Sequence, residues 1–154
     1  MSTGIVPREL TPEEREKLIQ AAIEAKGKAY SPYSNFRVGA ALFATDGNII
    51  LGSNIENASY GGTICAERTA LVKAVSEGTK SFLAIAVTSD VDEIVSPCGI
   101  CRQFIREFCS LKTPIYMVKS SYTPATSDTA VKAVLLEDIL PYSFGPEHLE
   151  MPRT

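Results

Sequence analysis

The sequence is poor in three features that mark common classes of protein. Its one histidine, His148, lies among polar residues near the C-terminus without a partner at ligand spacing, so we do not expect it to bind a metal. No apolar run approaches the length of a membrane span. The 15 basic residues are scattered and the net charge is −3, whereas a polynucleotide-binding surface normally shows a basic stripe. We therefore expect neither a membrane nor a nucleic acid as a partner.

The N-terminal segment, residues 1–10, also has no apolar stretch of the kind that directs export. Because disulfides need an oxidising compartment, we expect a cytoplasmic protein whose four cysteines are not joined in disulfides. A chain of 154 residues is long enough for one domain with a substantial core. We predict a flexible arm over residues 1–10 and a single domain over residues 11–154.

Local patterns along the chain predict helices and strands in alternation. Thr11 followed by Pro12 and two acids is typical of a helix start, and Gly27 of its end. Residues 36–45 form a strand that is apolar on both faces, which implies cover on both faces. The other expected elements are strand 48–53, helix 65–78, strand 82–89, helix 98–109, strands 113–119 and 131–135, and helix 137–140. This order predicts a three-layer α/β/α fold with a mixed sheet of about five strands.

Two short motifs, Cys-Ala-Glu-Arg at 65–68 and Pro-Cys-Gly-Ile-Cys at 97–101, supply three cysteines with metal-ligand spacing. Three thiolates leave one position of a tetrahedral zinc open, as a catalytic site requires. Cys109 is expected about 12 Å beyond Cys101 along one helix, so it cannot close the site and is predicted to lie in the core. A redox pair is the alternative, but it leaves the Cys-Ala-Glu sequence unexplained.

Both motifs are expected at helix N-termini, where free N–H groups and the helix dipole favour thiolates. We predict Cys65 at the helix cap. Glu67 is expected to contact the metal-bound water and not the metal itself. Arg68 lies three residues after Cys65, so it is expected to donate to that thiolate and offset the negative charge of the cluster. Glu67 would then act first as a base and afterwards as an acid.

A polar cluster at 54–58 follows the expected strand 48–53. Asn54 and Glu56 are two residues apart, so in extended backbone their side chains point the same way. A carboxylate beside an amide suits a sugar hydroxyl, which both donates and accepts hydrogen bonds. A solvated turn explains the cluster equally well, because loops are commonly polar.

Five motifs together carry a resemblance to a known family. They occupy residues 31–41, 54–58, 65–68, 96–103 and 140–146, and the similarity extends from about Tyr30 to Leu149. On these motifs the chain resembles the small homotetrameric zinc-dependent cytidine deaminases. The resemblance implies hydrolytic deamination of cytidine and deoxycytidine to uridine and deoxyuridine, with release of ammonia, in pyrimidine salvage.

The resemblance also implies roles for individual residues. One zinc per subunit would be bound by Cys65, Cys98 and Cys101, with Glu67 as the proton shuttle. The nucleoside would be held by Phe36 against the pyrimidine, Asn54 and Glu56 at the ribose, and the Ala66 backbone at the base. Tyr60 and Phe144 would complete a neighbouring subunit's site, with Tyr33 in the same contacts. For Phe144, a place in the local core is the alternative.

Three other functions fit part of the pattern. A polynucleotide deaminase would more often have histidine as first ligand and a basic channel, and this chain has neither. A deaminase for a nucleoside antibiotic shares the zinc motif, but Asn54 and Glu56 favour plain ribose. A zinc-binding interaction module without catalysis would have no use for Glu67.

Overall fold

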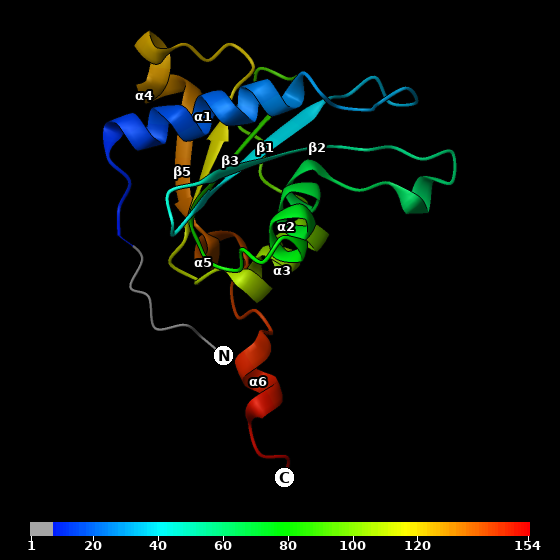
Figure 1. Ribbon diagram of the computed structural model, residues 1–154, viewed down its shortest axis with the longest axis vertical. Helices are drawn as coiled ribbons and strands as arrows, with labels where there is room; N and C mark the ends of the chain where they lie inside the picture. Colours follow the sequence, from blue (N-terminus) through cyan, green and yellow to red (C-terminus); the bar gives the residue numbers. More distant parts are fainter. Residues whose placement is uncertain (1–7) are drawn as a thin grey trace.

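The computed structural model describes residues 8–154, which are arranged around one five-stranded sheet (Figure 1). Its strands are β1 (Val38–Ala44), β2 (Ile49–Ser53), β3 (Phe82–Ser89), β4 (Pro114–Val118) and β5 (Val131–Leu135). Their order across the sheet is β2-β1-β3-β4-β5. β3 and β4 run parallel, and the other neighbouring pairs run antiparallel. The predicted mixed sheet is confirmed.

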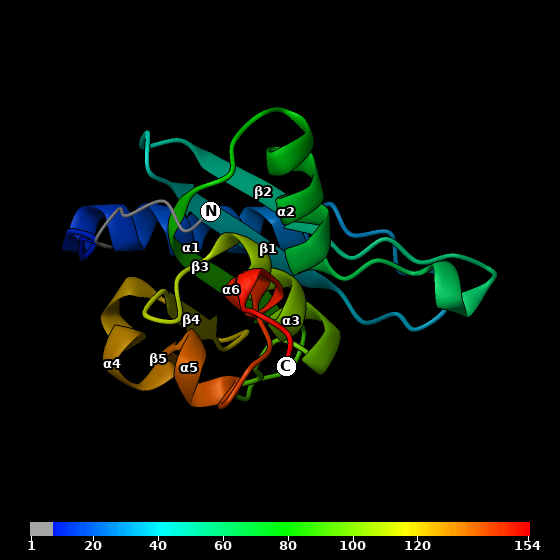
Figure 2. The same cartoon turned by 90° about the horizontal axis from the view of Figure 1, so that it is seen from below.

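Helices cover both faces of this sheet (Figures 1 and 2). Successive residues of β1 point to opposite faces, so Ala41 and Phe43 pack in the cluster that contains α1, while Leu42 and Ala44 pack in the other cluster. The first face is covered by α1 (Pro12–Lys26), and the second by α2 (Ala66–Ser76), α3 (Gly99–Phe108) and α5 (Leu136–Ile139). The strand is therefore apolar on both faces, and the three-layer α/β/α prediction is confirmed.

Two glycines allow the helices to approach the sheet closely. A Cβ on Gly39 of β1 would lie 2.1 Å from the carbonyl oxygen of Ala22 in α1. A Cβ on Gly52 of β2 would lie 2.4 Å from the backbone nitrogen of Ala70 in α2. Both distances are well inside van der Waals contact, so any larger residue would push a helix outward. Gly52 thereby helps to set the position of α2, whose first turn carries the Cys-Ala-Glu-Arg motif.

The predicted helix start at Thr11 is confirmed by a reciprocal pair of hydrogen bonds. The Glu14 N–H donates to the Thr11 hydroxyl at 3.2 Å, and the Thr11 N–H donates to the Glu14 carboxylate at 3.0 Å. Of the expected arm, residues 1–7 lie outside the described residues. Arg8 pairs with Glu14, and the division into an arm and one domain stays a prediction.

Four single-turn or very short elements were not predicted, because each is too short to show a helical period. They are η1 (Tyr60–Gly62), η2 (Pro124–Thr126), α4 (Ser127–Ala130) and α6 (Pro146–Glu150). Two loops, residues 27–37 and 54–65, project together from one end of the sheet (Figure 1). A backbone bridge of Tyr30 to Ile55 joins them, and a bridge of Ile55 to Ile64 closes the second loop on itself. In the part of the chain that the structure describes, no helix is both long and apolar enough to cross a membrane.

Candidate active site

Three cysteine sulfurs converge where the N-termini of α2 and α3 meet. Cys65 is the N-cap of α2, Cys98 is the N-cap of α3, and Cys101 lies in the first turn of α3. Their Sγ atoms all lie within 4.8 Å of one another, and those of Cys65 and Cys98 are 3.9 Å apart. Zinc–sulfur bonds of about 2.3 Å in a tetrahedron place two sulfurs about 3.8 Å apart. The three residues therefore fit a zinc ion, and the predicted cap position of Cys65 is confirmed.

The group offers three sulfur ligands and leaves a fourth position open. Within residues 8–154 no other histidine, cysteine or acidic side chain gathers with them as a ligand. Cys109 is packed in the core, where burial raises the pKa of its thiol to about 12, so it is held as a neutral thiol. The nitrogen Nδ1 of His148 instead accepts a hydrogen bond of 2.9 Å from the Gly145 N–H.

Arg68 contacts the cluster as predicted. Its Nη2 lies 3.4 Å from the Cys65 sulfur, one helical turn away. Hydrogen bonding from Cys101 and then from Arg68 lowers the pKa of Cys65 below its usual value, although partial burial of the thiol opposes this. Since zinc binds the thiolate and not the thiol, this environment favours the ligand form.

Glu67 lies beside the sulfurs and is almost completely buried. Glu67 is 4% exposed, and its Oε2 lies 3.7 Å from the Cys101 sulfur. Burial raises the pKa of its carboxyl, and the negative charge of Cys65 adds to the rise. A buried carboxyl next to an open metal position can exchange a proton with a group bound there and not with bulk water.

A pocket of about 420 Å³ opens onto this cluster. This volume falls within the range typical of sites for small molecules. Of the predicted residues, those that line the pocket are Phe36, Asn54, Glu56, Cys65, Glu67 and Cys98. Residues from four separate segments of the chain are thus brought to one cavity, and Asn54 and Glu56 do share its wall.

Both polar residues at the pocket also hold the loop that carries Phe36. The Asn54 amide donates to the Phe36 carbonyl at 2.8 Å and accepts from the Val38 N–H at 2.8 Å. The Glu56 carboxylate accepts from the N–H groups of Tyr33 and Ser34 at 2.9 and 3.1 Å. The Ser34 hydroxyl, as the largest cause, holds the pKa of Glu56 below its usual value. Glu56 is therefore presented to the pocket as a carboxylate with a set orientation.

Three of the predicted substrate-binding residues do not line the pocket of their own chain. Ala66 is fully buried at the start of α2. Tyr60 is 75% exposed on the projecting loops, where its ring centroid lies 5.8 Å from that of Tyr33. Phe144 is 57% exposed next to α6, so it is not a core aromatic of its own chain.

Several pocket residues were missed by the sequence analysis. They come from the end of β3, the segment before α3 and the loop before α2: Thr88, Ser89, Val95, Ser96 and Thr63. Single serines, threonines and valines show no distinctive spacing, so no local signal could have identified them. The position of β3 between β1 and β4 brings Thr88 and Ser89 to the cavity.

Comparisons with known proteins agree with this site. The family model for the cytidine and deoxycytidylate deaminase zinc-binding region matches residues 12–118. A cytidine deaminase of Halalkalibacterium halodurans is 46% identical over 88% of this chain and 98% of that protein. A probable cytidine deaminase of Dictyostelium discoideum is 59% identical over 62% of this chain and 66% of that protein. The crystal structure of cytidine deaminase from Burkholderia pseudomallei superposes with a TM-score of 0.77 at 40% identity, covering 88% of this chain and all of that one.

Proposed function

This chain belongs to the cytidine and deoxycytidylate deaminase family, and we propose that it deaminates cytidine and deoxycytidine by hydrolysis, forming uridine and deoxyuridine. One observation carries the proposal: an open three-cysteine group and the buried carboxylate of Glu67 share a pocket of nucleoside size. A metal site used only for structure would have a closed set of ligands and no need of that carboxylate.

The chemistry divides between the metal and the protein. Zinc held by the three thiolates supplies a Lewis acid that makes water nucleophilic at neutral pH. Glu67 takes a proton from the attacking water and passes it to N3 of the cytosine ring; it then takes the proton of the new C4 hydroxyl and gives it to the departing amine. The oxygen of water becomes bonded to C4, the bond from C4 to the amino nitrogen breaks, and ammonia leaves. Because Glu67 is buried, these protons stay on the substrate and the carboxylate.

We assign the nucleoside to the residues around the cavity. Phe36 packs against the pyrimidine, the Ala66 backbone contacts the base, and Asn54 and Glu56 bind the ribose hydroxyls with their remaining hydrogen-bonding capacity. Of the described residues that line the pocket, none is Lys or Arg, whereas Glu56 and Glu67 are acidic. A phosphate group on the substrate would meet negative charge without a cationic partner. This supports a free nucleoside and not a nucleotide as substrate.

Ammonia release by the zinc-loaded protein tests this function. We expect turnover of cytidine and deoxycytidine, and a kcat/KM for cytidylate lower by about a hundredfold or more, since an uncompensated charge costs several kcal/mol. Efficient turnover of cytidylate would contradict the charge argument. No turnover of either nucleoside by protein with one zinc per chain would contradict the function, and nucleoside antibiotics and single-stranded oligonucleotides would be tried next.

We propose further that the chain forms a homotetramer in which Tyr60 and Phe144 complete the site of a neighbour. Both aromatic side chains are exposed and lie outside the pocket of their own chain, which supports contact with another subunit. Tyr33, beside Tyr60, would join the same contacts.

Co-expression of two impaired variants tests the shared site. In a mixed tetramer, a Phe144→Ala subunit still contributes Glu67, and a Glu67→Gln subunit still contributes Phe144 to its neighbour. We expect the mixed protein to exceed the summed activity of the two separate variants. A monomeric mass in sedimentation equilibrium, or no gain on mixing, would contradict the arrangement.

The cysteines support a cytoplasmic location, because the cytoplasm is a reducing compartment. The four cysteines are free in the structure, and three of them must be thiolates to bind zinc. Oxidation of the neighbouring Cys65 and Cys98 would remove two ligands at once.

A further inference from the structure

The pocket rim at residues 33–38 has no regular secondary structure until β1 begins, yet every backbone N–H group in it has an acceptor. Each N–H group in turn finds an acceptor: Tyr33 and Ser34 on Glu56, Asn35 on the Ser31 carbonyl, Phe36 on the Ser34 hydroxyl, Arg37 on Asp90, and Val38 on Asn54. Three carboxylate or amide side chains from outside the segment therefore replace the bonds that a helix or strand would supply.

Two of these acceptors, Asn54 and Glu56, line the pocket, but the third does not. Asp90 follows the last residue of β3 and reaches back to the rim. Its Oδ2 accepts from the Arg37 N–H at 2.8 Å and from the Arg37 Nε at 3.1 Å, while its Oδ1 accepts from Nη2 at 2.9 Å. Lys26, the last residue of α1, places its Nζ 3.7 Å from the same carboxylate and donates to the Ser89 carbonyl at 3.1 Å.

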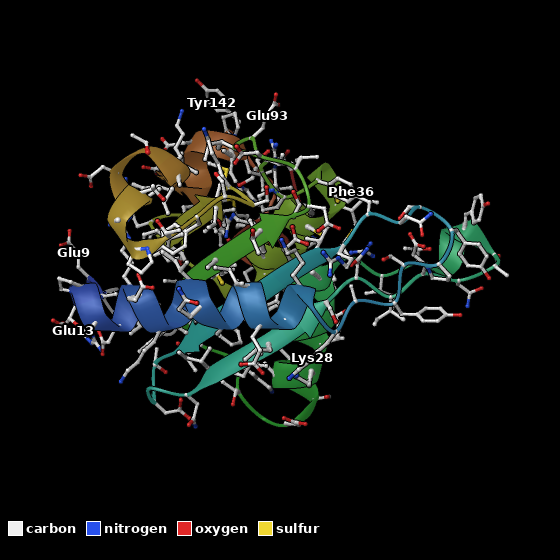
Figure 3. The ribbon with its side chains drawn as sticks, turned by 90° about the horizontal axis from the view of Figure 1, so that it is seen from above. Glu9, Glu13, Lys28, Phe36, Glu93 and Tyr142 are labelled. Carbon is white, nitrogen blue, oxygen red and sulfur yellow. The ribbon has the colours of Figure 1, made fainter. Side chains whose placement is uncertain are left out.

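Phe36 depends on this support because its own ring is only partly packed. The residue is 37% exposed, and Figure 3 labels it beside the chain that leads into β1. Its backbone is held on one side by Asn54, which binds the Phe36 carbonyl and the Val38 N–H. Asp90 holds Arg37, the residue that lies between Phe36 and Val38. Loss of Asp90 would free the Arg37 peptide and let both Phe36 and the Asn54 amide shift.

We propose that Asp90 is a positioning residue for substrate binding, which fixes the Phe36–Val38 segment so that Phe36 and Asn54 meet the nucleoside. The inference rests on the proposed function for its substrate. Because Asp90 lies outside the pocket lining and away from the cysteines, its removal acts on substrate affinity and leaves the chemical step in place. Charge-assisted hydrogen bonds of this kind hold a loop more strongly than neutral ones.

Steady-state kinetics of Asp90→Ala and Asp90→Asn test the proposal, with Asp92→Ala as the matched control. Asp92 lies on the same loop and binds Ser121 instead of the pocket rim. We expect Asp90→Ala to raise the KM for cytidine by about tenfold or more with kcat changed by less than about twofold, as loss of a bond to a charged group would do. Asp90→Asn keeps one acceptor for the Arg37 N–H, so it is expected to fall between Asp90→Ala and the parent. Asp92→Ala is expected to keep the parental KM.

Amide hydrogen exchange supplies a readout that does not depend on turnover. Exchange over residues 33–38 is expected to be faster in the Asp90 variants than in the parent and in Asp92→Ala. A KM within twofold of the parent in both Asp90 variants, or a fall in kcat at constant KM, would overturn the proposal. If Asp90→Ala does not fold, the KM and the amide exchange of Asp90→Asn decide whether the proposal holds. An inactive parent would refute the proposed function, and unchanged exchange at the rim would then still overturn the role of Asp90.

Discussion

Replacing Glu67 by glutamine is expected to reduce the turnover of cytidine by at least about a thousandfold, because the same carboxylate handles protons at more than one step. Glutamine has nearly the same shape but cannot accept and return a proton at Oε2. The zinc should remain, since the three sulfurs are all supplied by other residues. The measurement is ammonia release together with the zinc content per chain.

Glu77→Gln is the matched control for this variant. Glu77 caps the far end of α2 and is exposed, so the same chemical change there should leave kcat near the parental value. Turnover by Glu67→Gln within tenfold of the parent would remove Glu67 from the proton-transfer role. Loss of zinc from Glu67→Gln would instead make it a residue that supports the metal.

Cys101→Ala is expected to lose both the zinc and the activity. Cys101 is fully buried in the first turn of α3, and only two sulfurs would remain after its removal. Two thiolates bind zinc far more weakly than three, and zinc binding contributes to folding stability. We therefore expect little zinc by elemental analysis, no detectable turnover, and a thermal midpoint below that of the zinc-loaded parent.

Cys109→Ala separates the loss of a ligand from the loss of a buried sulfur. Cys109 ends the same helix and packs in the core, so this variant should lose some stability but keep zinc and turnover. One zinc per chain in Cys101→Ala would show that the three-cysteine assignment is wrong. Chelation of the parent provides a second test, because activity should disappear and return when zinc is added back.

The pocket rim depends on side chains that are far apart in the sequence. On their sequence pattern alone, Asn54 and Glu56 fit a ribose site and a solvated turn equally well. The structure shows a further task, because both side chains also hold the backbone of residues 33–38. Asp90, which completes that set, carries no motif, and its partner Arg37 is 53 residues away. A contact over such a distance depends on β1 lying next to β3, which no local pattern specifies.

Local sequence patterns predict the strands, the main helices, the metal ligands and the candidate proton shuttle. These follow from short-range physics: alternation of apolar residues, helix caps, and the fixed geometry of Cys98 and Cys101 within one helical turn. Which of these groups meet depends on how the helices and strands pack together. Cys65 and Cys98 are 33 residues apart, and their sulfurs approach because α2 and α3 pack on one face of the sheet with their N-termini together. The cavity wall and the role of Asp90 have the same origin, since they arise from the order of strands and not from any single segment.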